Sequence, residues 1–199
     1  MGEPPRQDWP LPDFLAWEER QAERYELLDG RPVMMTGGTQ AHALIAANLI
    51  ASLRPLLRGG PCRPGGSDLR VPMPGTGNSR YPDVTIDCGP FDRTSHDATE
   101  PAVVFEVLSK STRWYDQTTK LRDYDSVPSI RQYVCVSQDE PRVSVWTRGA
   151  EGRLLPRDDV TAGAVALEIA GHAVTLPLTD IYEGTGLLEA QTMPLTPPA

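Results

Sequence analysis

The sequence of 199 residues is poor in lysine and cysteine and has no long apolar run. Only Lys110 and Lys120 are lysines, whereas seventeen residues are arginines. No stretch approaches the roughly eighteen apolar residues that a membrane-spanning helix needs, so we expect no membrane as a partner. The first residues contain no apolar signal region, which favours a cytoplasmic protein.

The three cysteines, Cys62, Cys88 and Cys135, are widely spaced and odd in number. They form no pattern of metal ligands, so a zinc site is not expected. Their usage predicts reduced, mostly buried thiols, as is usual for a cytoplasmic protein.

The formal net charge is −8, and basic residues are in the minority. A protein that holds nucleic acid by bulk electrostatic attraction usually has a basic face, so this balance argues against such a protein. It does not exclude a nuclease whose acidic site recruits divalent cations. The segment between Lys110 and Arg122 is locally basic, because it contains four cations.

The length is sufficient for one domain with a full core. We predict a flexible leader over residues 1–10, a single folded domain over residues 11–188 and a disordered, proline-rich tail over residues 189–199. Asp29-Gly30 separates two short strand-like runs, which is typical of a tight β-hairpin turn. Gly37-Gly38-Thr39 precedes the longest stretch of helical periodicity, which ends at Gly59-Gly60.

The remaining elements are predicted from periodicity and from turn residues. Helices are expected over Leu11–Arg24 and Asp116–Val127, and strands near Asp68–Met73, Tyr81–Asp87, Ala102–Leu108, Gln132–Val136 and Arg142–Thr147, with edge strands or a hairpin after Leu154. This order predicts an α/β or α+β domain in which helices flank a mixed β-sheet.

Two acids and a lysine stand out as candidates for catalysis. Asp83 follows a proline and is expected near the opening of a strand, whereas Glu106 lies inside an apolar strand. A buried carboxylate needs a partner, and a metal ion or a lysine would serve. A partly desolvated lysine can shift its pKa and help to activate water, which arginine cannot do. The alternative is that Glu106 pairs with an arginine for purely structural reasons.

Several segments together resemble one known family. They are Tyr25–Gly30, His42, Pro82–Val84, Val104–Thr112, Tyr115–Tyr124 and Ile130–Tyr133. These residues are similar to a bacterial family of restriction-endonuclease-like proteins within the PD-(D/E)xK nuclease superfamily, long labelled as a domain of unknown function. The resemblance extends from about Pro12 to Trp146 and more faintly to Leu178.

The resemblance implies a restriction endonuclease-like fold and an Mg²⁺- or Mn²⁺-dependent endonuclease that cleaves DNA. It assigns Asp83 and Glu106 as catalytic acids that bind the metal. Leu108 occupies the standard position of the catalytic lysine, and the resemblance implies that Lys120 from the next helix replaces it. Lys110 is a second candidate for the same role.

Glu26 matches a first acid that often orients the site in this superfamily, and it is included among the catalytic residues. A homodimer is expected, because the two strands of a DNA duplex invite two sites. A non-catalytic module with the nuclease fold, which binds a protein partner or nucleic acid, is the alternative function. Glycoside hydrolysis by two carboxylates is a third interpretation, but it needs no lysine.

Other polar residues have simpler interpretations. His42 lies at the edge of the apolar stripe of the long helix, so a hydrogen-bonded structural histidine is expected. Gly37-Gly38-Thr39 could present amide groups to a phosphate, but a turn and a helix N-cap are the commoner use of such a segment. His96 and His172 have no partner at metal-ligand spacing.

Overall fold

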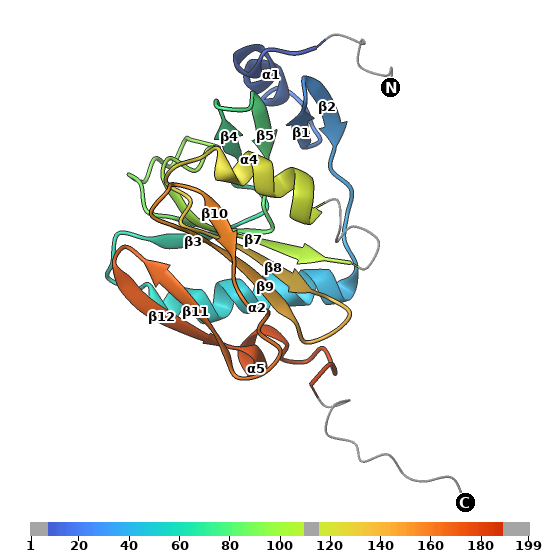
Figure 1. The fold of residues 1–199 in the computed structure, drawn as a ribbon. Coiled ribbons are helices and arrows are strands. Elements are labelled where there is room, and N and C mark those ends of the chain that lie inside the picture. The colour runs from blue at the N-terminus through green and yellow to red at the C-terminus, as the bar shows by residue number, and fades with distance from the viewer. Residues whose placement is uncertain (1–7, 110–115, 189–199) are drawn as a thin grey trace, which may run out of the picture.

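The structure is a computed structural model that describes residues 8–109 and 116–188. A mixed six-stranded sheet forms its centre, with the strand order β10-β9-β8-β7-β6-β3 (Figure 1). Its strands are β3 (Arg63–Gly66), β6 (Val84–Asp87), β7 (Pro101–Leu108), β8 (Gln132–Ser137), β9 (Val143–Arg148) and β10 (Leu154–Pro156). Only β7 and β8 pair in parallel. The mixed sheet expected from the sequence is therefore present.

One face of this sheet is covered by the long helix α2 (Gln40–Leu56), and the other by the short helix α4 (Leu121–Asp125) (Figure 1). The α2 side also carries the hairpin of β11 (Ala164–Ile169) and β12 (His172–Pro177), followed by α5 (Leu178–Ile181). The α4 side carries a second sheet, ordered β2-β1-β5-β4, and the helix α1 (Leu11–Glu18). The strands of that sheet are β1 (Tyr25–Leu28), β2 (Arg31–Met34), β4 (Val71–Met73) and β5 (Asn78–Arg80).

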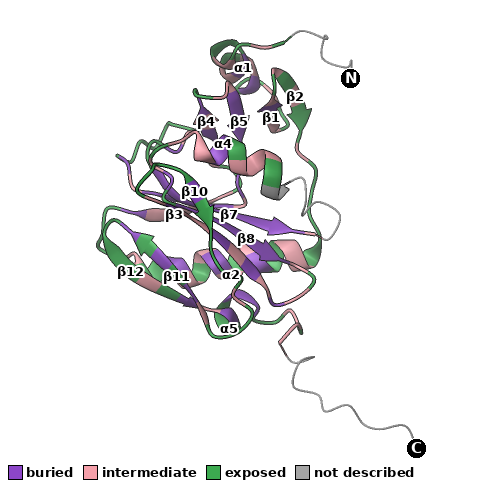
Figure 2. Ribbon diagram, in the orientation of Figure 1, coloured by how far each residue is buried: buried purple, intermediate pink, exposed green. Residues whose placement is uncertain are grey.

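β7 is buried along its whole length, as Figure 2 shows by colour. Val103, Phe105 and Val107 join the core beneath α2. Val104 and Leu108 point to the opposite face and join the core beneath α4. Because side chains alternate along a strand, Glu106 lies on the α4 side.

Local sequence signals account for the first hairpin and for the start of α2. Asp29 and Gly30 have positive φ angles of 47° and 76°, as the tight turn between β1 and β2 requires. Thr39 caps α2, because its side chain accepts a hydrogen bond from the backbone N–H of His42. Both features agree with the sequence prediction.

Other elements differ from the prediction. α1 ends at Glu18 and not at Arg24. The helix expected over Asp116–Val127 begins as a π-helical turn, η1 (Asp116–Lys120), and continues as α4. β3 and β5 were not predicted, because glycine, proline and polar residues dominate them and only pairing with neighbouring strands makes them extended.

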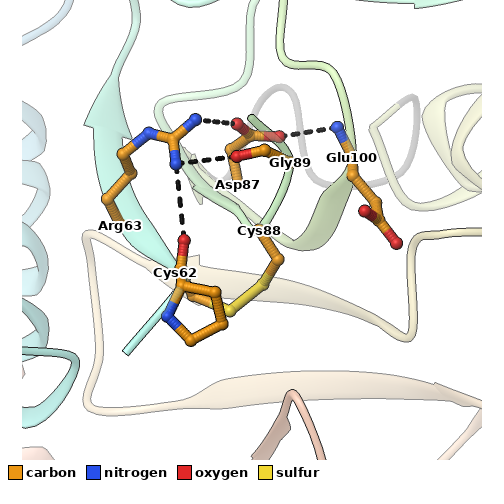
Figure 3. Close-up of a disulfide and its surroundings, with 7 residues drawn as sticks. Cys62, Arg63, Asp87, Cys88, Gly89 and Glu100 are labelled. Carbon is orange, nitrogen blue, oxygen red and sulfur yellow. Dashed lines mark hydrogen bonds and ion pairs between the residues drawn. A yellow bond between two sulfur atoms is a disulfide. The ribbon is translucent and has the colours of Figure 1, made fainter. Parts of the chain in front are cut away.

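The prediction of reduced thiols was wrong for two of the three cysteines. Cys62 and Cys88 form a disulfide (Figure 3), whereas Cys135 is free and buried. The pairing of β3 with β6 places Arg63 opposite Asp87, so the preceding and following cysteines also face each other. Beside the disulfide, the Arg63 guanidinium donates to Asp87 and to the Gly89 carbonyl (Figure 3).

Most of the leader predicted over residues 1–10, and the tail predicted over residues 189–199, lie outside the described residues. Residue Trp9 is described, and its backbone N–H donates to the carbonyl of Gly30. Within the described part of the chain, no helix has the length and hydropathy required to cross a membrane.

Candidate active site

Asp83 and Glu106 are brought together by the antiparallel pairing of β6 with β7. Val84 pairs with Phe105, so Asp83, one residue before β6, lies opposite Glu106. Residues directly opposite each other in an antiparallel pair project to the same face of the sheet. The backbone N–H of Val107 donates to Oδ2 of Asp83 at 2.7 Å, which fixes this junction. The strand pairing thus places two carboxylates side by side.

Glu106 is 3% exposed, and both of its carboxylate oxygens accept hydrogen bonds. Lys120 Nζ lies 2.7 Å from Oε2, and the hydroxyl of Tyr124 donates to Oε1. Burial raises the pKa of Glu106 to about 7, with Asp83 and Glu26 adding to the rise and Lys120 opposing it. The acid that the sequence placed inside an apolar strand is therefore poised between its neutral and charged forms at neutral pH.

Lys120 is the lysine that the structure places against Glu106. It is the last residue of η1 and directly precedes α4. Tyr124, one helical turn later, packs its ring on Tyr133 of β8, with ring centroids 5.0 Å apart. α4 is thereby anchored to the sheet, and the anchor holds Lys120 over β7. Lys110, the second candidate, lies outside the described residues.

His42 contacts the other acid of the pair. Its Nε2 lies 3.1 Å from Oδ2 of Asp83. This hydrogen bond is the main reason that the pKa of His42 is raised, and the charges of Asp83 and Glu106 add to the effect, while burial and Lys120 oppose it. The sequence predicted a hydrogen-bonded histidine here, and the structure identifies its partner as Asp83.

Glu26 belongs to the wall of the site and is held by two donors. Its Oε1 accepts from the backbone N–H of Tyr81, and its Oε2 accepts from Arg80, each at 3.1 Å. The same guanidinium donates to Asp123 of α4. Glu26 is thus part of a network joining β1, β5 and α4, and its charge raises the pKa of Glu106 from a distance.

These side chains line one open cavity of about 490 Å³. The first turn of α2 and the segment before it form one wall, and β7 with the residue that follows it forms another. The lining residues are Glu26, Met35, Thr36, Gly37, Gly38, Thr39, His42, Tyr81, Asp83, Glu106, Val107, Ser109, Lys120 and Gln138. The structure therefore gathers all four predicted site residues, Glu26, Asp83, Glu106 and Lys120, around one space.

The donor set suits a hard divalent cation held by few protein ligands. Within residues 8–109 and 116–188, no three His, Cys, Asp or Glu side chains are grouped closely enough to hold a metal ion. Mg²⁺ is commonly bound through only one or two carboxylates and keeps several waters. Both donors that contact the Asp83 carboxylate among the described residues lie on Oδ2, so Oδ1 of Asp83 can offer an oxygen ligand. Both oxygens of Glu106 accept hydrogen bonds, from Lys120 and Tyr124, so Glu106 would have to exchange one of these contacts for the cation. The pair contains no thiolate and therefore does not suit a soft metal ion.

Comparison with known proteins identifies the family. The family model "Putative restriction endonuclease" (Uma2) matches residues 11–176. The chain belongs to this family. In Synechocystis sp. (strain ATCC 27184 / PCC 6803 / Kazusa), "Uncharacterized protein slr1290" is 38% identical over 173 residues, covering 86% of this chain and 90% of that protein. From the same organism, "Uncharacterized protein sll1609" is 27% identical over 130 residues, covering 63% of this chain and 73% of that protein.

A solved structure agrees with the fold. It is the crystal structure of "a putative nuclease belonging to DUF820" from Anabaena variabilis ATCC 29413, with a TM-score of 0.65 and 14% sequence identity. The match covers 88% of this chain and 98% of that chain. At this identity, the likeness speaks for the fold alone. The restriction endonuclease-like mixed sheet flanked by helices, predicted from the sequence, is confirmed.

Three contacts of the site were not foreseen from the sequence: Tyr124 with Glu106, His42 with Asp83, and Thr39 with Gln138. Tyr124 follows Lys120 by four residues, a spacing that puts both side chains on one side of a helix. This spacing could have indicated that both side chains contact the same residue, which is Glu106. The contact of His42 with Asp83 joins residues far apart in the sequence and has no local signal. Thr39 donates from Oγ1 to Oε1 of Gln138 at 2.6 Å, which ties the start of α2 to the segment after β8.

Proposed function

We propose that this protein is an Mg²⁺-dependent endonuclease, able to use Mn²⁺, that hydrolyses phosphodiester bonds in DNA. The supporting observation is the position of Asp83 opposite Glu106, one residue beyond the pairing of β6 with β7, at an open cavity that Lys120 also lines. Membership of the family described as "Putative restriction endonuclease" supports the choice of DNA as the substrate.

Asp83 and Glu106 would provide the oxygen ligands of the cation. A bound Mg²⁺ would polarise the scissile phosphate and lower the pKa of a water molecule. The raised pKa of Glu106 fits this role, because a cation between the two acids would favour the charged form, which burial and, to a smaller extent, the neighbouring acids disfavour.

Lys120 brings a positive charge to the wall of the cavity, 2.7 Å from Glu106. It would hold the attacking water or stabilise the negative charge that develops on the phosphate. Glu26 would act less directly: through Arg80 and the Tyr81 backbone it fixes the wall that precedes Asp83.

The test is plasmid cleavage with Mg²⁺ or Mn²⁺ by the wild-type chain, Asp83→Ala and Lys120→Met, purified in parallel. Asp180→Ala provides the matched control, because Asp180 is an exposed aspartate of α5 outside the cavity. We expect nicking by wild type and the control, and a loss of at least about 100-fold in the other two. Equal activity in Asp83→Ala would identify a contaminant and refute the site. No activity from any variant on varied substrates would favour a non-catalytic module.

We also propose that the active form is a homodimer, since cutting both strands of a duplex calls for two sites. Sedimentation velocity on the full chain, with and without duplex DNA, would measure the assembly. A strictly monomeric species that still makes double-strand breaks would contradict the proposal.

A further inference from the structure

We propose that His42 is a positioning residue that orients Asp83 for the cation, an inference that rests on the proposed function. The Nε2–H of His42 donates to Oδ2 of Asp83, so that Oδ1 is the oxygen left to the cavity. His42 would act through Asp83 and would touch neither the phosphate nor the water.

Two donors from different elements converge on Oδ2 of Asp83. Val107 N, from β7, lies at 2.7 Å, and His42 Nε2, from α2, lies at 3.1 Å. The terminal torsion of an aspartate is soft, so a single hydrogen bond leaves the carboxylate free to rotate about it. A second donor on the same oxygen removes that freedom and fixes the direction of Oδ1.

The position of the imidazole is itself built into the start of α2. The backbone N–H of His42 donates to Oγ1 of Thr39 at 3.1 Å, and this hydroxyl donates to Gln138. Gly38 packs against the ring so closely that a Cβ there would lie 2.8 Å from both Cγ and Nδ1. A glycine is therefore required at position 38 for the imidazole ring to occupy the position in which it contacts Asp83. A histidine that only filled space at the helix edge would not need these restraints.

The same geometry supplies a matched pair of variants. Gly38→Ala keeps His42 but forces its ring to move, whereas a Cβ at Gly37 would have nothing within 4 Å. Neither glycine has a positive φ, so alanine is compatible with the backbone at both positions. His42→Ala removes the donor, and His42→Gln restores an N–H donor of similar reach.

The experiment measures Mn²⁺ binding by isothermal titration calorimetry, without DNA, and plasmid cleavage across a range of Mn²⁺ concentrations. Groups that hold a metal ligand in place typically change metal affinity or activity by about 10- to 100-fold. We expect a weakening in this range for His42→Ala and Gly38→Ala. We expect His42→Gln and Gly37→Ala to stay within about threefold of wild type, and circular dichroism and thermal unfolding to show that each variant is folded.

Wild-type Mn²⁺ affinity in both His42→Ala and Gly38→Ala would overturn the inference. So would a His42→Gln variant that binds Mn²⁺ normally and fails to cleave, because His42 would then act on the reacting groups. Absence of any Mn²⁺ binding that depends on Asp83 would remove both the site and the role of His42. If Mn²⁺ binding depends on His42 as expected but no DNA is cleaved, the inference stands and the proposed nuclease function fails.

Discussion

Glu106 shows how a single buried acid can link stability to function. Its side chain lies in β7 with apolar neighbours on both sides, and burial raises its pKa to about 7. Lys120 and Tyr124 satisfy its oxygens without removing the desolvation penalty. An acid placed purely for stability would be better replaced by an apolar residue, so its presence in β7 fits a role in the cavity.

The first prediction concerns Glu106→Gln. In the unfolded chain this acid ionises near the ordinary glutamate pKa of 4.5, whereas the folded chain keeps the proton until about pH 7. The folded state therefore binds more protons between these values, and the wild-type free energy of unfolding falls as the pH rises through this window. We expect Glu106→Gln to be as stable as wild type at low pH and more stable above pH 7, by on the order of 3 kcal/mol.

Urea denaturation in EDTA, at a series of pH values, measures this difference. Glu151→Gln is the control, because Glu151 is exposed in a turn. The same variant of Glu106 should lose metal-dependent cleavage. A stability difference that does not change with pH would show that Glu106 is already ionised in the folded chain.

Residue types and local order singled out Asp83, Glu106 and a nearby lysine, and the family resemblance selected Lys120 as that lysine. The sequence indicated an acid at a strand opening, an acid in the next strand and a lysine on the following helix, and the structure places them around one cavity. The contact between His42 and Asp83 could not be predicted, because it depends on how α2 is seated against the sheet. Periodicity in the sequence predicts which residues share one face of a helix, but it does not predict which residues of another element that face will contact.

Among the secondary-structure elements, those with strong local signals were predicted and those created by pairing were missed. The hairpin of β1 and β2 follows from Asp29-Gly30, and the burial of β7 follows from its apolar run. β3 has the sequence Arg-Pro-Gly-Gly and is extended because β6 pairs with it. Since β3 was not foreseen, neither was the register that sets Cys62 opposite Cys88, and the disulfide was missed for the same reason.

The disulfide joins β3 to β6 at the end of β6 remote from Asp83, and it closes a segment with a sequence separation of 26. A cross-link over a loop of this length is expected to contribute about 3 kcal/mol, chiefly by restricting the unfolded chain. We therefore expect the variant with both Cys62→Ser and Cys88→Ser to lose about that much free energy of unfolding. Cleavage well below its melting temperature should be unchanged. Denaturation of wild type with and without reductant provides the parallel measurement, and equal stabilities would show that the bridge does not form.

The network around Arg80 joins three elements, because its guanidinium pairs with Glu26 of β1 and Asp123 of α4. Arg80 is 1% exposed, so Arg80→Met would leave the buried Asp123 and the partly buried Glu26 without this cation. We expect this variant to be destabilised by roughly 3–5 kcal/mol. The control is Arg122→Met, since the Arg122 side chain is 59% exposed and its pairs with Asp29 and, at 3.8 Å, with Asp123 should together be worth less than about 1 kcal/mol. Similar losses in the two variants, measured by urea denaturation, would contradict a structural role for the Arg80 network.

The net charge of the whole chain affects its electrostatic interaction with a polyanion such as DNA. At −8 it repels DNA, and the acids Glu26, Asp83 and Glu106 add local repulsion at the cavity. A divalent cation at the acid pair would remove part of that repulsion and provide a positive point for a phosphate. DNA affinity should therefore depend on the cation more strongly than it would for a basic DNA-binding protein.

Lys120→Met allows this dependence to be measured without cleavage, since it leaves Asp83 and Glu106 intact. We expect fluorescence anisotropy to show that a labelled duplex binds this variant at least about tenfold more tightly with Mg²⁺ than with EDTA, because a bound dication changes the sign of the local field that a phosphate meets. The combined variant with Asp83→Ala and Lys120→Met should lose the difference, which separates a cation at this site from a general effect of Mg²⁺ on the duplex. Equal affinity in Mg²⁺ and EDTA would mean that DNA is held elsewhere on the surface. Asp83 and Glu106 would then make no contribution to DNA binding.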